Sequence, residues 1–245
     1  MPKTYFEAVG EFHRVFGHPI ASTRQTHLIT ENPKLVQFRI DLIDEEFQEM
    51  LQAVAENNIT EVLDAAGDLT YVVNGMAQVF GIDMDLDIYN KIEDFECILP
   101  ETLQKNLITQ DPELVQHRMT LISISIEKLK YAVADNDVTI VADALADIMC
   151  YINGLSKVFG FDLYTVFRLV HESNMSKLCR NESEAMDTIK HYKTLPGFED
   201  IPVSYRPSTA SNASDDSYYV IYNSDTGKIL KSMYFNLPDF SCLTN

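Results

Sequence analysis

The 245-residue sequence predicts an all-α fold: a duplicated helical bundle that forms a pseudo-dimer within one chain, with a small C-terminal β-hairpin. The first observation is a repeat, because segment 28–39 returns 79 positions later as 107–118. The register continues without a gap to residues 83 and 162, and about 25 of the 56 aligned positions are identical. Two copies this similar are expected to fold alike.

Helix signals within each copy are the second observation. The Asn-Pro pair at 32–33 and the Asp-Pro pair at 111–112 each place an N-cap residue before a proline at the first helical position. Between residues 35 and 54, apolar side chains recur every three or four positions, the pattern of an amphipathic helix. This outer helix is expected to end near Glu56, where two Asn residues break the pattern.

A second helix of each copy, over about 60–80 and 139–159, is apolar on nearly all sides and is expected to lie centrally. Gly81 and Gly160 end these inner helices, and a shorter third helix follows each glycine. Because neither helical hairpin can cover its own inner helix, the two hairpins should pack together as a four-helix or larger bundle with pseudo-twofold symmetry.

The repeats are flanked by further elements. Apolar periodicity predicts a helix over 6–16, and another over 182–192. Small polar residues at 208–217 predict a flexible loop, and segments 218–222 and 228–231 are expected to pair as a β-hairpin. The predicted domains are an N-terminal metal-binding repeat (1–100), a C-terminal nucleotide-contacting repeat (101–200) and a tail (201–245).

Composition limits the classes of function. With 37 acidic and 19 basic side chains the formal charge is −18, which disfavours binding to nucleic acid or to an anionic membrane. The four cysteines form no CxxC pair, which indicates a reducing compartment. No apolar signal segment opens the chain, so we expect a cytoplasmic protein.

Two groups of carboxylates are the strongest chemical signal. Glu45, Glu46 and Glu49 lie on the outer helix, and Asp64 and Asp68 lie one turn apart on the otherwise apolar inner helix. At an effective dielectric near 20, two such aspartates about 6 Å apart repel by roughly 2–3 kcal/mol. A divalent cation held by oxygen ligands would offset that repulsion. The alternatives are a solvated acidic face for the glutamates and partly hydrated aspartates.

The second copy provides an internal comparison. Asp143 and Asp147 persist there, but Ile124, Ser125 and Lys128 replace the three glutamates. These side chains cannot chelate a hard cation, so the second copy is expected to bind metal poorly.

The glutamate triplet followed by the acidic inner helix resembles the signature of the all-α nucleoside triphosphate pyrophosphohydrolases, the superfamily of MazG-like enzymes, dimeric dUTPases and phosphoribosyl-ATP pyrophosphohydrolases. Segments 10–19, 170–178 and 227–231 each resemble single motifs of its phage and bacterial branch. The resemblance covers most of the chain. One departure is Ala65, where many members carry a glutamate; Asp64, one place earlier, is the expected substitute.

The resemblance implies a Mg²⁺ site, with Mn²⁺ as an alternative cation, on the triphosphate of a bound nucleotide. The implied ligands are Glu45, Glu46, Glu49, Asp64 and Asp68. It also implies that Asn174 and Lys177 contact the nucleotide. The first copy carries Phe95 and Ile98 at the positions of these two residues, so neither copy holds a complete set. We therefore expect one working site assembled from both halves.

The implied chemistry is in-line attack of water on the triphosphate, which releases a nucleoside monophosphate and pyrophosphate. Glu46 is the expected general base, with Glu49 as the alternative, and Lys177 supplies positive charge to the phosphates. Further expected substrate contacts are His171, Tyr71, Asn74 and His13. For each of these four, a structural role in capping or core packing is the alternative.

The sequence therefore favours a Mg²⁺-dependent nucleoside triphosphate pyrophosphohydrolase that acts on deoxynucleotides in pool sanitation. One alternative is phosphoribosyl-ATP hydrolysis, whose usual members are short single-copy domains. Another is a non-catalytic nucleotide-binding or scaffold protein, because half of the duplicated machinery has decayed. A homodimer of the pseudo-dimeric chain is left open.

Overall fold

The computed structural model describes residues 3–85, 111–198, 200–211 and 217–244. The chain forms two compact units. We call them the bundle unit (residues 1–10, 20–170 and 239–245) and the C-terminal unit (residues 11–19 and 171–238). Both copies of the helical hairpin belong to the bundle unit, so the sequence repeats are not separate compact units. The predicted boundaries at 100 and 200 stay a prediction.

The first helical hairpin consists of α3 (Pro33–Ala55) and α4 (Ile59–Phe80). Asn32 caps α3 by accepting a hydrogen bond from the Leu35 backbone N–H, and Asn58 caps α4 in the same way. Asn57, with φ of 54°, turns the chain between the two helices. Gly81 ends α4 in the left-handed region, with φ of 62°. The predicted helix limits are confirmed to within one residue.

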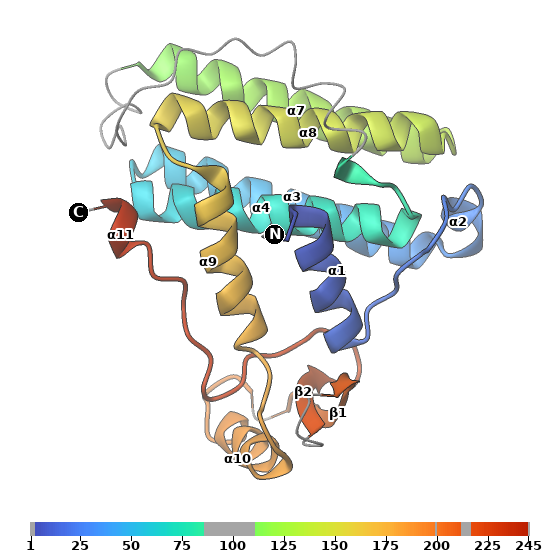
Figure 1. Cartoon of the computed structure of the whole chain (residues 1–245), viewed down its shortest axis with the longest axis vertical. Coiled ribbons are helices and arrows are strands. Elements are labelled where there is room, and N and C mark those ends of the chain that lie inside the picture. Colours follow the sequence, from blue (N-terminus) through green and yellow to red (C-terminus); the bar gives the residue numbers. More distant parts are fainter. Residues whose placement is uncertain (1–2, 86–110, 199, 212–216, 245) are drawn as a thin grey trace. The chain divides into compact units, whose positions relative to one another are not determined.

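The second hairpin repeats this geometry with α7 (Pro112–Ala134) and α8 (Val138–Phe159). Asn136 and Gly160 take the left-handed conformation at the equivalent positions. The inner helices α4 and α8 contact each other, as do the outer helices α3 and α7. In Figure 1 one hairpin lies over the other, which confirms the predicted duplicated bundle.

Helix α8 is long and apolar enough, among the described helices, to cross a membrane by length and composition. However, 67% of its most apolar stretch is buried inside the protein. That burial is what an inner helix of a bundle requires.

The remaining helices are α1 (Tyr5–Phe16), the short α2 (Leu28–Glu31), α9 (Leu163–Met175) and the C-terminal α11 (Ser241–Thr244). Helix α9 is the predicted third helix of the second copy. The corresponding helix of the first copy falls largely outside the described residues. Within the bundle unit, α9 approaches α4 closely at Gly67, where an added Cβ would lie 2.5 Å from a methyl group of Val170.

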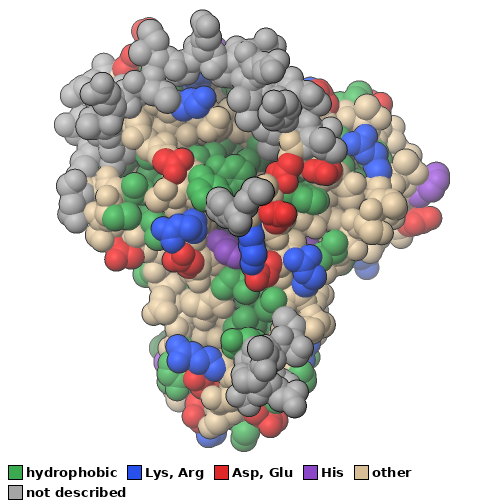
Figure 2. Space-filling view, viewed as in Figure 1, with side chains coloured by type: hydrophobic (Ala, Val, Ile, Leu, Met, Phe, Trp, Pro, Cys, Tyr) green, Lys and Arg blue, Asp and Glu red, His purple; other side chains and the backbone are tan. Residues whose placement is uncertain are grey.

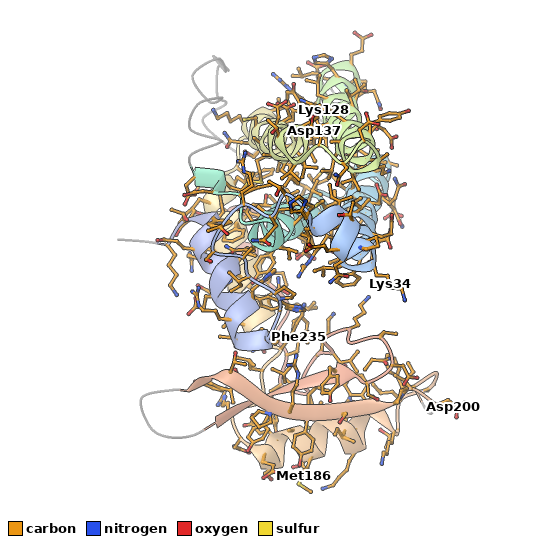
Figure 3. The ribbon with its side chains drawn as sticks, turned by 90° about the vertical axis from the view of Figure 1, so that its right-hand side faces the viewer. Lys34, Lys128, Asp137, Met186, Asp200 and Phe235 are labelled. Carbon is orange, nitrogen blue, oxygen red and sulfur yellow. The ribbon has the colours of Figure 1, made fainter. Side chains whose placement is uncertain are left out.

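The C-terminal unit contains α10 (Glu182–Tyr192), as predicted, and the antiparallel strands β1 (Val203–Ser211) and β2 (Ser217–Asn223). Both strands pack on α10, an arrangement visible in the lower part of Figure 3. The core of this unit is built around four buried side chains, Cys179, Ala185, Tyr192 and Ile221.

The predicted strand pairing was wrong in part. The main partner of β2 is β1, and the predicted partner, segment 228–231, contributes only an isolated bridge between Ile229 and Tyr222. Strand β1 also takes up residues 208–211 of the predicted loop. The reason lies far away in sequence: Arg206 and Ser208 donate hydrogen bonds to backbone carbonyls in the last turn of α1. These carbonyls have no partner within their own helix.

Gly67→Ala tests the close approach of α9 to α4. Alanine has the higher helix propensity, by about 1 kcal/mol. Overpacking against Val170, whose side chain is short and stiff, typically costs about 1–3 kcal/mol, so we expect a lower melting temperature. A melting temperature equal to or above that of the native protein, measured by circular dichroism, would show that the two helices separate without cost.

Candidate metal site

The three glutamates of the predicted metal site project from the middle of α3. Glu45 and Glu49 are exposed and lie one turn apart, whereas Glu46 is partly buried toward the neighbouring helices. The capped start of α3 and its packing on α4 fix this register. The site is therefore carried by regular helix rather than by a loop.

Asp64 and Asp68 face the same side of α4. Both are partly exposed, and the residues between them, 65–67, are buried. They belong to an outward stripe with Glu61 and Val72, which agrees with the alternative of partly hydrated aspartates. A helix that is buried on most sides keeps one polar stripe at the surface, and the two aspartates occupy it.

The structure brings all five carboxylates into electrostatic contact at Glu46. Burial, together with repulsion from Asp68, Glu49, Glu45 and Asp64, raises the pKa of Glu46 from 4.5 to about 8. The acidic residues of two different helices thus act on one carboxyl group. Such a concentration of negative charge is typical of a site that receives a cation.

The donor chemistry of this group suits a hard cation. Every side chain in it offers carboxylate oxygen, the ligand that Mg²⁺ and Mn²⁺ prefer. Within the described residues no three His, Cys, Asp or Glu side chains converge to the distance at which they would hold a metal ion. The five residues are therefore a neighbourhood of oxygen donors on the adjoining helices α3 and α4. They fit a cation that keeps part of its water shell, as Mg²⁺ usually does.

The equivalent place in the second copy is organised differently. Lys128, at the position of Glu49, donates hydrogen bonds to both Asp143 and Asp147. This ion pair gives a physical reason for the prediction that this half binds metal poorly, since an ammonium group already offsets part of the negative charge of the aspartate pair. The sequence comparison identified the substitution but missed the ion pair.

Asn174 and Lys177 lie in the C-terminal unit, at and just beyond the end of α9. Asn174 is 8% exposed, and its Oδ1 accepts a hydrogen bond of 2.5 Å from Lys177 Nζ. The two residues expected to contact the nucleotide are thus neighbours in space as well as in sequence. Their assembly with the carboxylates into one composite site stays a prediction; Phe95 and Ile98 lie outside the described residues.

Two serines hold this segment in place through contacts that the sequence did not reveal. Ser173 Oγ donates to the Asn236 backbone carbonyl at 2.8 Å, and Ser176 Oγ accepts from the Asn236 backbone N–H at 3.0 Å. Ser232 Oγ donates to the Ser176 carbonyl at 3.0 Å. The C-terminal tail therefore fixes the backbone on either side of Asn174.

The other expected substrate contacts are well packed. In the bundle unit, the Tyr71 ring stacks on Phe167 at 5.6 Å, and Asn74 is fully buried with its Nδ2 donating to the Thr70 carbonyl. In the C-terminal unit, His13 is buried with Nδ1 2.8 Å from the Pro19 carbonyl oxygen, and His171 Nε2 lies 3.5 Å from a Glu11 oxygen. Each has a structural role, and their contacts with substrate stay predictions.

Arg39 was also missed by the sequence reasoning. It is 5% exposed on α3, its Nε has no hydrogen-bond partner among the described residues, and burial lowers its pKa to about 10. It lies two helical turns before Glu46 on the same face, a spacing that could have drawn attention to it. Arg118 occupies the same position in the second copy, which lacks the glutamates.

The fold and the carboxylate set define a duplicated all-α protein with a group of acidic side chains on α3 and α4. The family model described as phosphoribosyl-ATP pyrophosphohydrolase matches residues 9–94 and again residues 92–174. The chain therefore belongs to the phosphoribosyl-ATP pyrophosphohydrolase family, in an internally duplicated form, and the family supports a nucleotide pyrophosphohydrolase activity.

Uncharacterized protein L479 of Acanthamoeba polyphaga mimivirus is similar to the whole chain. It is 47% identical over 244 residues, which cover 98% of this chain and 95% of that protein. No solved structure matches the chain.

The raised pKa of Glu46 has a consequence for stability. In the metal-free protein the folded state holds the Glu46 proton more tightly than the unfolded state, so stability falls as pH rises from 4.5 to about 8. Glu46→Gln removes this ionisation. We expect the variant to be more stable than the native protein by about 1–3 kcal/mol at high pH, with little difference near pH 5.

Urea unfolding in EDTA at both pH values measures this difference. Glu45→Gln is the matched control, because Glu45 is exposed and its own desolvation is small. A Glu46→Gln gain that is the same at both pH values would contradict the assignment of the buried charge to Glu46.

Proposed function

We propose that this protein is a Mg²⁺-dependent nucleoside triphosphate pyrophosphohydrolase that releases a nucleoside monophosphate and pyrophosphate. The observation that carries the proposal is that the four other carboxylates of α3 and α4 all lie near enough to Glu46 to raise its pKa. A solvated acidic face would leave these charges apart, and it would not raise the pKa of one member so far. Membership of a pyrophosphohydrolase family supports the same class of reaction.

The proposed cation would be held by Glu45, Glu46, Glu49, Asp64 and Asp68. When bound, it supplies positive charge that neutralises phosphate oxygens during the displacement. Water attacks the α-phosphorus, the bond to the β-phosphate oxygen breaks, and pyrophosphate leaves. A carboxylate accepts the proton of the attacking water. Glu46 is proposed for that role, with Glu49 as the alternative.

Lys177 and Asn174 are proposed to act on the substrate as a hydrogen-bonded pair. Lys177 brings a positive charge to phosphate oxygens, and Asn174 offers an amide that hydrogen-bonds to sugar or phosphate. The contacts of Ser173 and Ser176 with the C-terminal tail hold both residues in a defined orientation. Such preorganisation is what a binding group requires.

The substrate is proposed to be a deoxynucleoside triphosphate in an intracellular nucleotide pool. Phosphoribosyl-ATP is the second candidate, and the description of the matching family favours it. Both substrates release pyrophosphate from a nucleotide, so the same carboxylates serve either reaction. The fit of the base and sugar in the pocket decides between them.

A panel of nucleotides tests the activity and the substrate together. Pyrophosphate release is measured with purified protein, Mg²⁺ and each canonical nucleoside triphosphate, dUTP and phosphoribosyl-ATP. Turnover is expected to fall at least about 100-fold in Glu46→Gln. If no substrate is turned over faster than by this variant, the protein is a binding or scaffold protein rather than an enzyme.

Lys177→Ala separates the role of the C-terminal unit from that of the carboxylates. We expect kcat/KM to fall about 10- to 100-fold, because a phosphate loses its charged hydrogen-bond donor. Lys193→Ala, at an exposed position of the same unit, is the control. Ile98→Ala, at the position equivalent to Lys177 in the first copy, should likewise leave activity intact. Equal losses in all three variants would argue against a single composite site.

A further inference from the structure

The second copy contains an internal ion cluster. Lys128 Nζ bonds to Asp143 Oδ2, and it lies 2.6 Å from Asp147 Oδ2. Lys128 projects from α7, and the two aspartates lie one turn apart on α8; Figure 3 labels the lysine within this helix pair. One ammonium group therefore bridges both carboxylates.

The duplication shows which part of the first copy this cluster replaces. Asp143 and Asp147 stand at the positions of Asp64 and Asp68, and Lys128 stands at the position of Glu49. The formal charge of the five equivalent positions changes from −5 in the first copy to −1 in the second. The aspartate pair is thus the same, but its surroundings have lost the charge that a divalent cation would balance.

The other two positions offer the aspartates no alternative partner. Ile124, at the position of Glu45, is 59% exposed, and Ser125 Oγ donates to the Leu121 carbonyl of its own helix. The nearby Lys130 bonds to Asp44 and Glu127 instead. Of these three positions on α7, Lys128 is therefore the one that bonds to the aspartate pair.

The ammonium form of Lys128 is strongly favoured. Burial would lower the pKa of Lys128, but hydrogen bonds and attraction to Asp143 and Asp147 outweigh it, and the net shift is upward. With three N–H donors, an ammonium group can serve two carboxylates at once. At neutral pH it therefore carries its positive charge.

We propose that Lys128 is a tethered replacement for the divalent cation, so that its ammonium group holds the aspartate pair of the second copy in the absence of metal. The second copy is then independent of metal, because a side chain of the protein itself supplies the positive charge beside the two aspartates. The proposal rests on the proposed function in one respect: it takes from it that the first copy binds a divalent cation. It predicts that shortening Lys128 returns the aspartate pair to dependence on an external cation.

An external cation could reach the aspartate pair from the protein surface. A pocket of about 450 Å³ lies beside Lys128, and Ile124, Tyr131 and Ile140 are among the residues that line it. Truncation of the lysine would extend this pocket toward Asp143 and Asp147. A hydrated Mn²⁺ or Mg²⁺ ion could then approach both carboxylates from solvent.

The test uses the full chain with the first site disabled by Glu45→Gln, Glu46→Gln and Glu49→Gln together, so that metal effects report on the second copy. In this background, Lys128→Ala is compared with Lys130→Ala. The two lysines form a matched pair, because each has a 35% exposed side chain and bonds to two carboxylates. Melting temperature is measured in EDTA and in millimolar MnCl₂.

Lys128→Ala is expected to lower the melting temperature in EDTA by about 3–8 °C, because two carboxylates lose their common cation. MnCl₂ should restore at least half of that loss, whereas any loss in Lys130→Ala should persist. No loss in EDTA, or a loss that MnCl₂ does not restore, would mean that Lys128 forms an ordinary ion pair and would overturn the proposal.

Lys128→Glu provides a second measurement if Lys128→Ala does not fold. It returns the third carboxylate to its original position and should raise the Mn²⁺ stoichiometry, read by isothermal titration calorimetry, from zero to one per chain in the same background. A stoichiometry that stays at zero in Lys128→Glu counts against the proposal. Neither measurement uses turnover, so an absence of pyrophosphohydrolase activity would leave both results interpretable.

Discussion

Packing of the inner helices α4 and α8 against each other is the contact on which the bundle depends. Each inner helix is apolar on nearly every side, and its own outer helix can cover only part of that surface. The second copy of the hairpin covers the rest, which explains why a duplicated chain forms one bundle rather than two independent domains. The polar stripe left on each inner helix is narrow, and it is there that both aspartate pairs lie.

This arrangement imposes the same electrostatic problem on both halves. Two carboxylates one turn apart, flanked by buried apolar residues, are unfavourable unless a positive charge lies near them. The first copy adds three more carboxylates, and repulsion among the five contributes to the raised pKa of Glu46. The second copy removes those three and introduces Lys128. The inner helices can thus keep the aspartate pair at the same two positions, while the neighbouring outer helices determine the charge around it.

Much of this could be predicted from the sequence, because the deciding interactions are local or are repeated. Helix ends follow from caps and glycines within a few residues, and the repeat identifies equivalent positions without any structure. The pairing of β1 with β2 could not be predicted, since Arg206 and Ser208 are anchored by carbonyls of α1 that lie roughly 190 residues away. The partial exposure of Asp64 and Asp68 could only be left open as an alternative, because an apolar composition does not show which narrow stripe of a helix reaches the surface.

Catalysis and structural support place different demands on a cation. A divalent ion that is exchanged with solvent can bridge phosphate oxygens, but it stabilises the fold only in proportion to its concentration and affinity. A tethered ammonium is present at every metal concentration, at a cost of up to about 2 kcal/mol in side-chain entropy, and it cannot activate water. A half that only supports the bundle therefore gains from the lysine, whereas a half that hydrolyses nucleotides cannot use it. In a duplicated chain, one copy can use the exchangeable divalent ion while the other uses the tethered lysine.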